Sequence, residues 1–279
     1  MKAVFGRKKV LSAMNSHIQL PNFIIKNFRD VKTGDVPYLD LNQQRIRSCR
    51  SAVLGTEPDY YSVDMEKYLS KNIELPFSNV VSAIKGFLAG QDESINLPIT
   101  VEDDFVQYLV SSLSRSCLAF DIYKKNSIFS QFIPGMVTHE RLLAHSLQNK
   151  ETFAKRFADF KMVVIGNDTQ IPFVVPRNCT YSILYSGEQH IIAPVSPTFA
   201  FSMIPVESKE FPNEAERLVY IKDPEFVAAM NNNALMFEYT FNKCFVATPD
   251  RDELNRLKYF LQKNFEILEK NRTEIRESK

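Results

Sequence analysis

The sequence predicts a single α+β domain that is mostly helical, with a small N-terminal β-hairpin and a mid-chain antiparallel sheet or meander of about five strands. Short β-rich segments occur in two groups, near residue 40 and between residues 160 and 206, and segments with helical spacing lie between and after them. Strands and helices do not alternate regularly, as they would in a doubly wound parallel sheet. No low-complexity linker divides the 279 residues, so we treat 1–279 as one domain.

Two short segments near residue 40 predict the hairpin. Val36–Leu41 and Arg45–Arg50 carry β-type residues on either side of Asn42-Gln43. The Asn-Gly pair that most strongly signals a hairpin turn is absent. Ahead of the hairpin, the spacing predicts a short helix over Pro21–Phe28, because proline is well suited to the first turn of a helix.

Capping residues and apolar spacing predict the longer helices. Ser62 and Glu66 form a capping-box pattern, and Asp223 is an N-cap residue followed by Pro224. Thr138 begins another helix, and Pro76 is expected to bend or break the helix in which it lies. The predicted helices cover residues 63–88, 100–123, 139–147, 151–157, 224–242 and 250–276.

The middle of the chain is rich in short apolar segments separated by Pro, Gly or Asn, which end strands and form turns. Ser196 lies between Pro194 and Pro197 and is expected to serve a turn. One further short strand is expected to end at Val246. The segments predicted to form the sheet are Phe160–Ile165, Ile171–Val175, Thr180–Tyr185, His190–Ala193 and Phe199–Val206.

The last predicted helix carries apolar residues near a heptad spacing, with Asn264 at one position of the seam. Two alternatives follow from this pattern. Segment 250–279 packs on its own domain, or it binds a partner protein or a second copy of the chain through residues 250–276. The seam residues are Leu254, Leu257, Leu261, Phe265 and Leu268.

The net charge of +1 hides an uneven distribution along the chain. Residues 1–50 hold ten Lys or Arg against three Asp, a net charge of about +7. Residues 51–104 hold ten Asp or Glu against three Lys, about −7. Either the first segment is an exposed basic surface for an anionic partner, or the two segments pack together and neutralise each other.

The first of these alternatives predicts a nucleic-acid-binding surface. Clustered Lys and Arg side chains bind phosphates and release counterions, and Phe5, Phe23 and Tyr38 are interleaved with them here. The candidate binding residues are Arg7, Lys8, Lys9, Lys26, Arg29, Arg45, Arg47 and Arg50.

Several function classes are excluded because their motifs are absent. The sequence has no CxxC, HExxH or GxSxG motif and neither glycine-rich phosphate loop, and it holds only 8 Gly. We therefore predict no resident metal site. The four cysteines lie more than sixty residues apart and are expected to be free thiols. No signal peptide or membrane span is evident, so we expect a cytoplasmic protein without a membrane partner.

One segment of the chain has the form of a nuclease motif. Glu207-Ser208-Lys209 has the E-x-K form of some metal-dependent nucleases, with Glu188 one strand earlier as a second carboxylate. His17, in the basic segment, is placed to act as a general base or to contact a phosphate. If the protein is an enzyme, we expect a hydrolase of the nuclease type that uses a divalent cation such as Mg²⁺. The candidate catalytic residues are His17, Glu207 and Lys209.

Four stretches follow one another in an order that matches a known family pattern. They are His17–Phe28 (pattern H(H)xxPxxxLxxF), Asp59–Glu74 (xxYs…E+yL…iE), Ile191–Pro197 (iifPlsP) and Met230-Asn231 (an lN pair). Together they resemble the uncharacterised bacterial domain-of-unknown-function family DUF4238, over roughly residues 15 to 250. The family positions are His17, Pro21, Glu74, Arg115, Arg177, Asn178, Ser196 and Asn231.

Two positions depart from the family pattern. Where the family often has FitSDnP, this chain has Pro176 and Arg177 in place of Ser and Asp, so any role of that Asp is lost. His17 lies four residues before Pro21, with Ile18 at the next position, and matches only the first His of the family doublet.

The resemblance implies a bacterial or phage-related setting. Our leading hypothesis is an effector of a bacterial antiviral defence or conflict system that binds or cleaves nucleic acid. The alternative is a non-catalytic adaptor or regulatory protein that docks a partner protein through its C-terminal helix. The loss of the family Asp at Arg177 favours this alternative.

Overall fold

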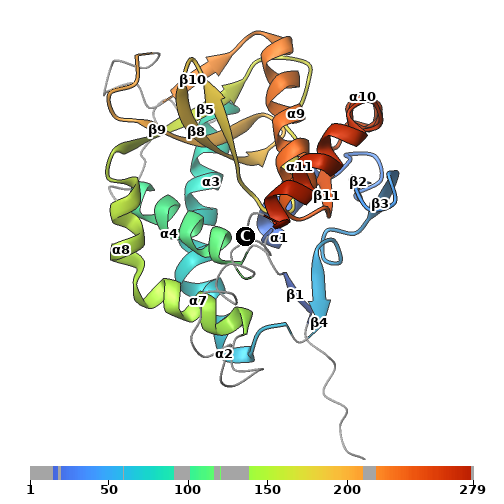
Figure 1. The fold of residues 1–279 in the computed structure, drawn as a ribbon. Helices are drawn as coiled ribbons and strands as arrows, with labels where there is room; N and C mark the ends of the chain where they lie inside the picture. The colour runs from blue at the N-terminus through green and yellow to red at the C-terminus, as the bar shows by residue number, and fades with distance from the viewer. Residues whose placement is uncertain are drawn as a thin grey trace, which may run out of the picture.

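The structure is a computed structural model that describes residues 15–17, 20–58, 60–90, 101–115, 120, 138–209 and 218–277. One sheet has five strands, and Figure 1 shows it in the upper half of the molecule, with α3 and α4 below it and α9 beside it. A four-stranded sheet lies on the right, next to the last two helices. Both hydrophobic cores contain residues of the five-stranded and the four-stranded sheet. The expected α+β class therefore holds, but "mostly helical" understates the β content.

The five-stranded sheet has the order β10-β5-β9-β8-β7. Strand β10 runs parallel to β5, and the other neighbours are antiparallel. The parallel pair makes the sheet mixed, and β10 was not predicted from the sequence. The strands are β5 (Phe160–Asn167), β7 (Tyr181–Tyr185), β8 (Glu188–Ser196), β9 (Phe199–Pro205) and β10 (Leu218–Ile221).

The prediction that Ile171–Val175 is a strand of this sheet was wrong. Only Val175–Pro176 (β6) pairs with another strand, and it does so in the four-stranded sheet. The preceding backbone satisfies its donors in other ways. Phe173 donates its N–H to the carbonyl of Pro197 at 2.9 Å, and Val174 donates to the side chain of Asn231 at 3.0 Å. Backbone groups satisfied in this way need no ladder partner.

The four-stranded sheet has the order β3-β2-β11-β6, with all neighbours antiparallel. Its first two strands, β2 (Val36–Asp40) and β3 (Arg45–Cys49), pair as a hairpin. They do not stand alone, because β11 (Phe245–Ala247) joins them from the far end of the chain. A separate two-stranded sheet pairs β1 (Asn15–His17) with β4 (Thr56–Pro58).

The hairpin turn forms without Asn-Gly because Asp40 and Gln44 organise it. The Asp40 carboxylate accepts hydrogen bonds from the backbone N–H groups of Asn42 and Gln43, both at 3.0 Å. Gln44 then takes a left-handed conformation with φ 52°, which returns the chain into β3. An aspartate at this position mimics a backbone turn and compensates for the missing glycine.

Capping explains where several helices begin. Ser62 accepts from Met65 N at 3.2 Å, and Thr138 accepts from Arg141 N at 3.2 Å. Pro76 lies in the first turn of α3, directly after a π-helical stretch at Ser70–Glu74, so the helix predicted over 63–88 changes its geometry just before this proline. The helices are α1 (Asn22–Ile25), α2 (Val63–Leu69), a π-helix (Ser70–Glu74), α3 (Leu75–Leu88), α4 (Val101–Ser114), α7 (His139–Gln148), α8 (Lys150–Ala154), α9 (Pro224–Phe241), α10 (Arg251–Lys263) and α11 (Phe265–Glu277). Two 3₁₀ turns cover Lys26–Phe28 and Lys155–Phe157.

The five-stranded sheet separates two hydrophobic cores. Strand β9 shows the division, because its side chains alternate between the two faces. Phe201 packs with the aromatic residues of α3 and α4, while Ala200 faces the core that contains α9. In the first core the rings of Phe77 and Tyr108 stack at 4.3 Å, and those of Phe105 and Phe201 lie 4.9 Å apart. No helix in the described ranges is both long and apolar enough to cross a membrane.

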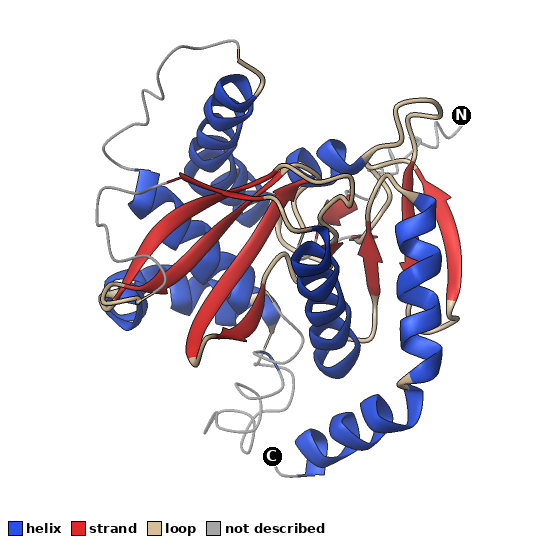
Figure 2. Cartoon of the chain, turned by 90° about the horizontal axis from the view of Figure 1, so that it is seen from above, coloured by secondary structure: helices blue, strands red, loops and turns tan. Residues whose placement is uncertain are grey.

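The last predicted helix is two helices that meet at Asn264, which caps the end of α10. Figure 2 shows α11, next to the C-terminus, turning away from α10 at this point. The apolar seam packs on its own domain, as one of the two alternatives proposed. Its leucines belong to the core that contains α9 and strand β2. They are Leu254, Leu257, Leu261 and Leu268.

Asn231 of α9 should be a strong contributor to stability. Its side chain accepts from Val174 N at 3.0 Å and donates to Pro172 O at 2.9 Å and to Glu253 Oε1 at 2.7 Å. We expect Asn231→Ala to lower the free energy of unfolding by about 2 to 3 kcal/mol, because buried groups lose their partners. Asn233→Ala is the matched control, because Asn233 is exposed and its side chain bonds to Ala229 O of the same helix. It should lower the free energy of unfolding by less than about 0.5 kcal/mol. Urea denaturation measures both, and equal losses would contradict this role for Asn231.

Candidate functional site

The turn between β6 and β7 lies among buried polar side chains from distant parts of the chain. Arg177 donates its backbone N–H to Phe245 O at 3.1 Å, and Cys179 N donates to Pro176 O at 2.9 Å. Cys179 is buried and has a φ of 62°, in the left-handed region that non-glycine residues rarely adopt. Such a conformation costs of order 1 kcal/mol or more and persists only where the surroundings enforce it.

Arg115 brings a buried positive charge to this region. It follows α4, its side chain is fully buried, and its Nη1 lies 3.4 Å from Oε1 of Glu74 at the end of the π-helix. Its Nε also donates to Ser111 O at 3.3 Å. Burial, the largest single effect, would lower the pKa of Arg115. The charge of Glu74, together with weaker contributions from Tyr61, Cys179 and Tyr108, outweighs it, and the pKa stays above its ordinary value. Single π-helical turns occur often at functional sites.

Glu238 of α9 brings a buried carboxyl to the same turn. Its Oε2 accepts from the backbone N–H of Asn178 at 3.1 Å and from Asn242 Nδ2 at 3.2 Å. Burial raises the pKa of Glu238 to about 7, although the hydrogen bond from Asn178 and the charge of Arg177 oppose the shift. Within the described chain its second oxygen, Oε1, is buried without a hydrogen-bond partner. A carboxyl with this pKa changes charge near neutral pH.

Cys179 and Tyr108 complete the polar side of the turn. Burial raises the pKa of the Cys179 thiol to about 11, and burial also raises the pKa of Tyr108. Ser112 Oγ donates to Asn178 O at 3.0 Å and ties α4 to the turn. Because the thiolate is the reactive form of cysteine, Cys179 is protonated and poorly suited to act as a nucleophile at neutral pH. We call Glu74, Tyr108, Arg115, Asn178, Cys179 and Glu238 the polar cluster.

Arg177 points to another side of the turn. Its Nη1 donates to Cys244 Sγ at 2.8 Å, and its Nη2 lies 3.4 Å from Oε1 of Glu57 on β4. Glu57 pairs with Ser16 of β1, so the strand that carries His17 lies beside this contact. The side chain of His17 is outside the described part of the structure. The structure thus links Arg115 and Asn178 through α4 and places Arg177 beside β1 and β4.

Three further candidate positions from the sequence have structural roles. Pro21 precedes the first turn of α1, and Asn231 holds the segment before β6. Ser196 Oγ accepts from Thr198 N at 3.0 Å, which is the turn role expected from the sequence. Pro21, Ser196 and Asn231 therefore organise the backbone and are not part of the polar cluster.

The candidate nuclease residues are not assembled into a metal site. Glu207 and Lys209 are exposed at the end of β9, on a different sheet from the strand of His17. The Glu188 carboxylate already accepts from Ser208 Oγ at 2.5 Å and from Lys209 N at 2.9 Å, and these bonds lower its pKa. Among the described residues, no group of three or more His, Cys, Asp or Glu is arranged to hold a metal ion. Cys49, Cys179 and Cys244 are free thiols.

The candidate basic residues that the structure describes lie on the surface. Arg7, Lys8 and Lys9 fall outside the described residues. In the described part, no basic side chain of residues 20–50 forms an ion pair with a carboxylate of residues 51–104. Arg47 pairs with Asp40 of its own hairpin, with Nε and Oδ2 3.9 Å apart. The exposed basic residues are Lys26, Arg29, Lys32, Arg45, Arg47 and Arg50.

These arginines extend along strand β3. Arg29 Nη2 donates to Ser51 Oγ at 2.6 Å, which places it beside Arg50 just beyond the strand. From α10, Arg251 Nη2 donates to Ser48 Oγ at 2.8 Å. We call Arg29, Arg45, Arg47, Arg50 and Arg251 the basic edge, since β3 is the outermost strand of its sheet.

Sequence reasoning missed Glu238, Tyr108 and Cys179. One signal for Glu238 was present, because it shares a helix face with the buried residues Ala234 and Leu235, where a charge is unusual. Comparison with known proteins adds no further residues. The sequence matches no protein-family model, no curated protein and no solved structure at a significant level.

Glu238 should make stability depend on pH in a defined direction. Its folded pKa of about 7 lies above the ordinary value of 4.5, so the folded state holds the proton more tightly. The stability that protonated Glu238 contributes to the folded state is therefore fully present below about pH 4.5. It is lost as the pH rises toward 7. Relative to wild type, Glu238→Gln should gain stability across this interval by up to about 1.4 kcal/mol per pH unit.

Urea denaturation at pH 5, 6 and 7 measures this difference. Glu225→Gln, an exposed change in the first turn of the same helix, is the matched control and should show no such trend. A wild-type to Glu238→Gln difference that stays constant from pH 5 to 7 would show that Glu238 titrates normally.

Proposed function

We propose that the protein binds nucleic acid through the basic edge. The observation that carries this proposal is that the arginines of the basic edge are exposed and that none is paired with the acidic segment 51–104 in the described structure. The sequence alone left open whether that segment neutralises them. Phosphate backbones bind such surfaces through charge and counterion release.

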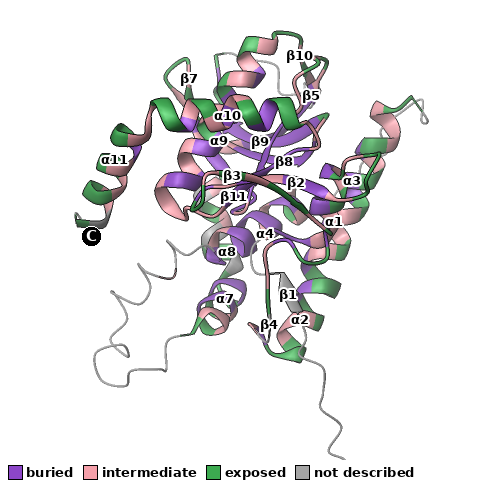
Figure 3. Ribbon diagram, turned by 90° about the vertical axis from the view of Figure 1, so that its right-hand side faces the viewer, coloured by how far each residue is buried: buried purple, intermediate pink, exposed green. Residues whose placement is uncertain are grey.

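The geometry of β3 suits an extended anionic chain. Arg45 and Arg47 lie on the same face of the strand, about 7 Å apart, because a strand rises about 3.4 Å per residue. Arg29 and Arg50 continue the positive charge past the end of the strand. Figure 3 shows β3 as a largely exposed strand across the front of the molecule, with α10 above it.

The existing contacts of these arginines are weak competitors for a phosphate. The Arg47–Asp40 pair is partly exposed and its atoms are 3.9 Å apart, and such surface pairs contribute at most about 1 kcal/mol. A guanidinium group can bind a phosphate through two parallel hydrogen bonds, which is a stronger contact. In the described structure the side chains of Arg29 and Arg251 hydrogen-bond to serine hydroxyls, so their charges remain available.

The proposal concerns binding. A place in a bacterial defence or conflict system is supported by the family resemblance alone. A nuclease step gains no support from Glu207 and Lys209. The nearby Glu188 carboxylate is already hydrogen-bonded to Ser208 and Lys209, and the described residues form no group of three metal ligands.

Fewer structural observations support the alternative of an adaptor that docks a partner through the last helix. The leucine seam of α10 is buried in the protein's own core. The apolar residues left on the outer surface of the last two helices are Tyr259 and Ile267, which are 67% and 60% exposed. Single exposed apolar residues are common on protein surfaces.

Neutralising the basic edge should weaken binding in a salt-dependent way. We expect the triple change Arg45→Gln, Arg47→Gln and Arg50→Gln to lower the affinity for a 20-nucleotide single strand about 10- to 100-fold at low salt. The slope of log Kd against log salt should fall by about 2, since each lost phosphate contact removes about 0.7 to 0.9. Fluorescence anisotropy with labelled DNA and RNA measures both quantities.

The matched control removes three exposed lysines elsewhere, through Lys71→Gln, Lys209→Gln and Lys263→Gln. It changes the net charge equally but should leave at least half of the salt slope intact. Equal losses in the two triple variants would show that net charge, and not the basic edge, determines binding. A wild-type affinity that does not fall with salt would remove the proposal.

A further inference from the structure

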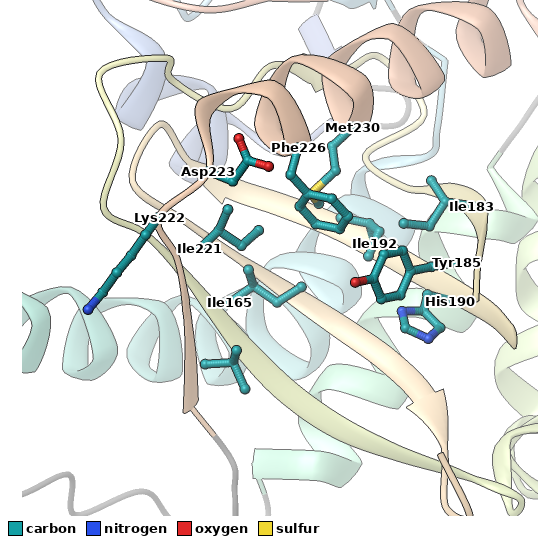
Figure 4. Close-up of a pocket in the computed structure, with 11 residues that line it drawn as sticks. Ile165, Ile183, Tyr185, His190, Ile192, Ile221, Lys222, Asp223, Phe226 and Met230 are labelled. Carbon is teal, nitrogen blue, oxygen red and sulfur yellow. The ribbon is translucent and has the colours of Figure 1, made fainter. Parts of the chain in front are cut away.

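A mainly apolar pocket of about 280 Å³ lies between the five-stranded sheet and the first turns of α9. Its walls come from four strands and one helix. Figure 4 shows Ile165 and Ile192 on the sheet side, with Phe226 and Met230 of α9 covering them. None of the residues of the polar cluster or of the basic edge lines it.

The alternation of β9 explains why the sheet leaves room here. Ala200 pairs with Ile165 of β5, and Ser202 pairs with Ile192 of β8, so these two small residues share the face that carries the isoleucines. The bulky residues of β9, such as Phe201, point to the opposite face and fill the other core. A central strand with small side chains on one face leaves volume between its neighbours and the helix above.

Polar groups gather at one end of the pocket. Figure 4 shows the Tyr185 ring with its hydroxyl directed toward the pocket interior and His190 beside it. The two rings lie 5.7 Å apart, and His190 Nε2 lies 3.8 Å from Glu188 Oε2. Apolar walls with a few convergent polar groups are typical of small-molecule sites.

We propose that this pocket binds a small, uncharged aromatic molecule of one or two rings that carries one hydroxyl, N–H or carbonyl group. The ring lies between the sheet isoleucines and Phe226, and its polar group bonds to the Tyr185 hydroxyl. An engineered cavity of about 150 Å³ accommodates benzene, so 280 Å³ has room for a substituted ring or a bicyclic one.

The charge of the pocket excludes the obvious ionic alternatives. An anion would lie near the Glu188 carboxylate, whose hydrogen bonds from Ser208 and Lys209 keep it ionised. A cation would have to leave water for walls made mostly of isoleucine, phenylalanine and methionine, which is costly without a buried counter-charge. Lys222 and Asp223, which directly precede α9, also line the pocket but are exposed at its rim.

Indole is a suitable probe because the protein contains no tryptophan. Its fluorescence, excited where tyrosine absorbs little, therefore reports only the ligand. We expect a saturable shift of indole emission to shorter wavelength with the full chain, and competition by both p-cresol and toluene. The absence of a saturable shift, or tighter binding of indole-3-acetate than of indole, would overturn the proposal.

Two substitutions locate the site. Tyr185→Phe should weaken p-cresol about threefold to tenfold and leave toluene within twofold, since only p-cresol loses a hydrogen bond. Val219→Phe, at the partly exposed wall on β10, should abolish binding of both by filling the pocket. Tyr220→Phe is the matched control, because Tyr220 is next to Val219 and its ring lies against Gly166 on the other face. Equal weakening of p-cresol and toluene by Tyr185→Phe, or retained binding in both variants, would refute this location.

Discussion

The pairing of Phe245–Ala247 on both sides is the contact on which the rest of the structure depends. Strand β11 bonds to β2 on one side and to β6 on the other, and all three of its residues are buried. It thereby joins the N-terminal hairpin to the turn at 176–180. It also connects α9 and α10, which precede and follow β11 in the chain. Because β11 covers the inner edge of β2, strand β3 becomes the outer edge of the sheet and carries its arginines into solvent.

The polar cluster follows from the same arrangement. Arg177 N bonds to the carbonyl of Phe245, so the turn that carries Asn178 and Cys179 is fixed against β11. Buried polar groups need partners, and here Glu238 of α9 and Ser112 of α4 supply them from separate parts of the chain. The left-handed Cys179 is held by these contacts. The cluster lies within the fold, whereas the basic edge lies on its surface, and the two have different roles in our account.

Local sequence patterns predicted the individual elements well and their partners poorly. Ser62, Thr138 and Asp223 cap the helices expected from them, because a cap depends only on residues within one turn. The parallel pairing of β10 with β5 and the insertion of β11 between β2 and β6 depend on residues far apart in sequence. For the same reason, no local signal indicated that Glu238 meets the backbone of Asn178, 60 positions away. Whether the arginines are exposed or paired with the acidic segment was left open by the sequence, and the tertiary structure was needed to decide it.

The central claim is that β3 is an open surface where nucleic acid binds, and the location of binding tests it most directly. Hydrogen–deuterium exchange of the full chain, with and without a single-stranded oligonucleotide at saturating concentration, measures that location. Our account predicts slower exchange in residues 45–51, at the outer edge strand and its end, with little change in the buried β11. Slowed exchange confined to other segments, with residues 45–51 unchanged at full occupancy, would contradict it.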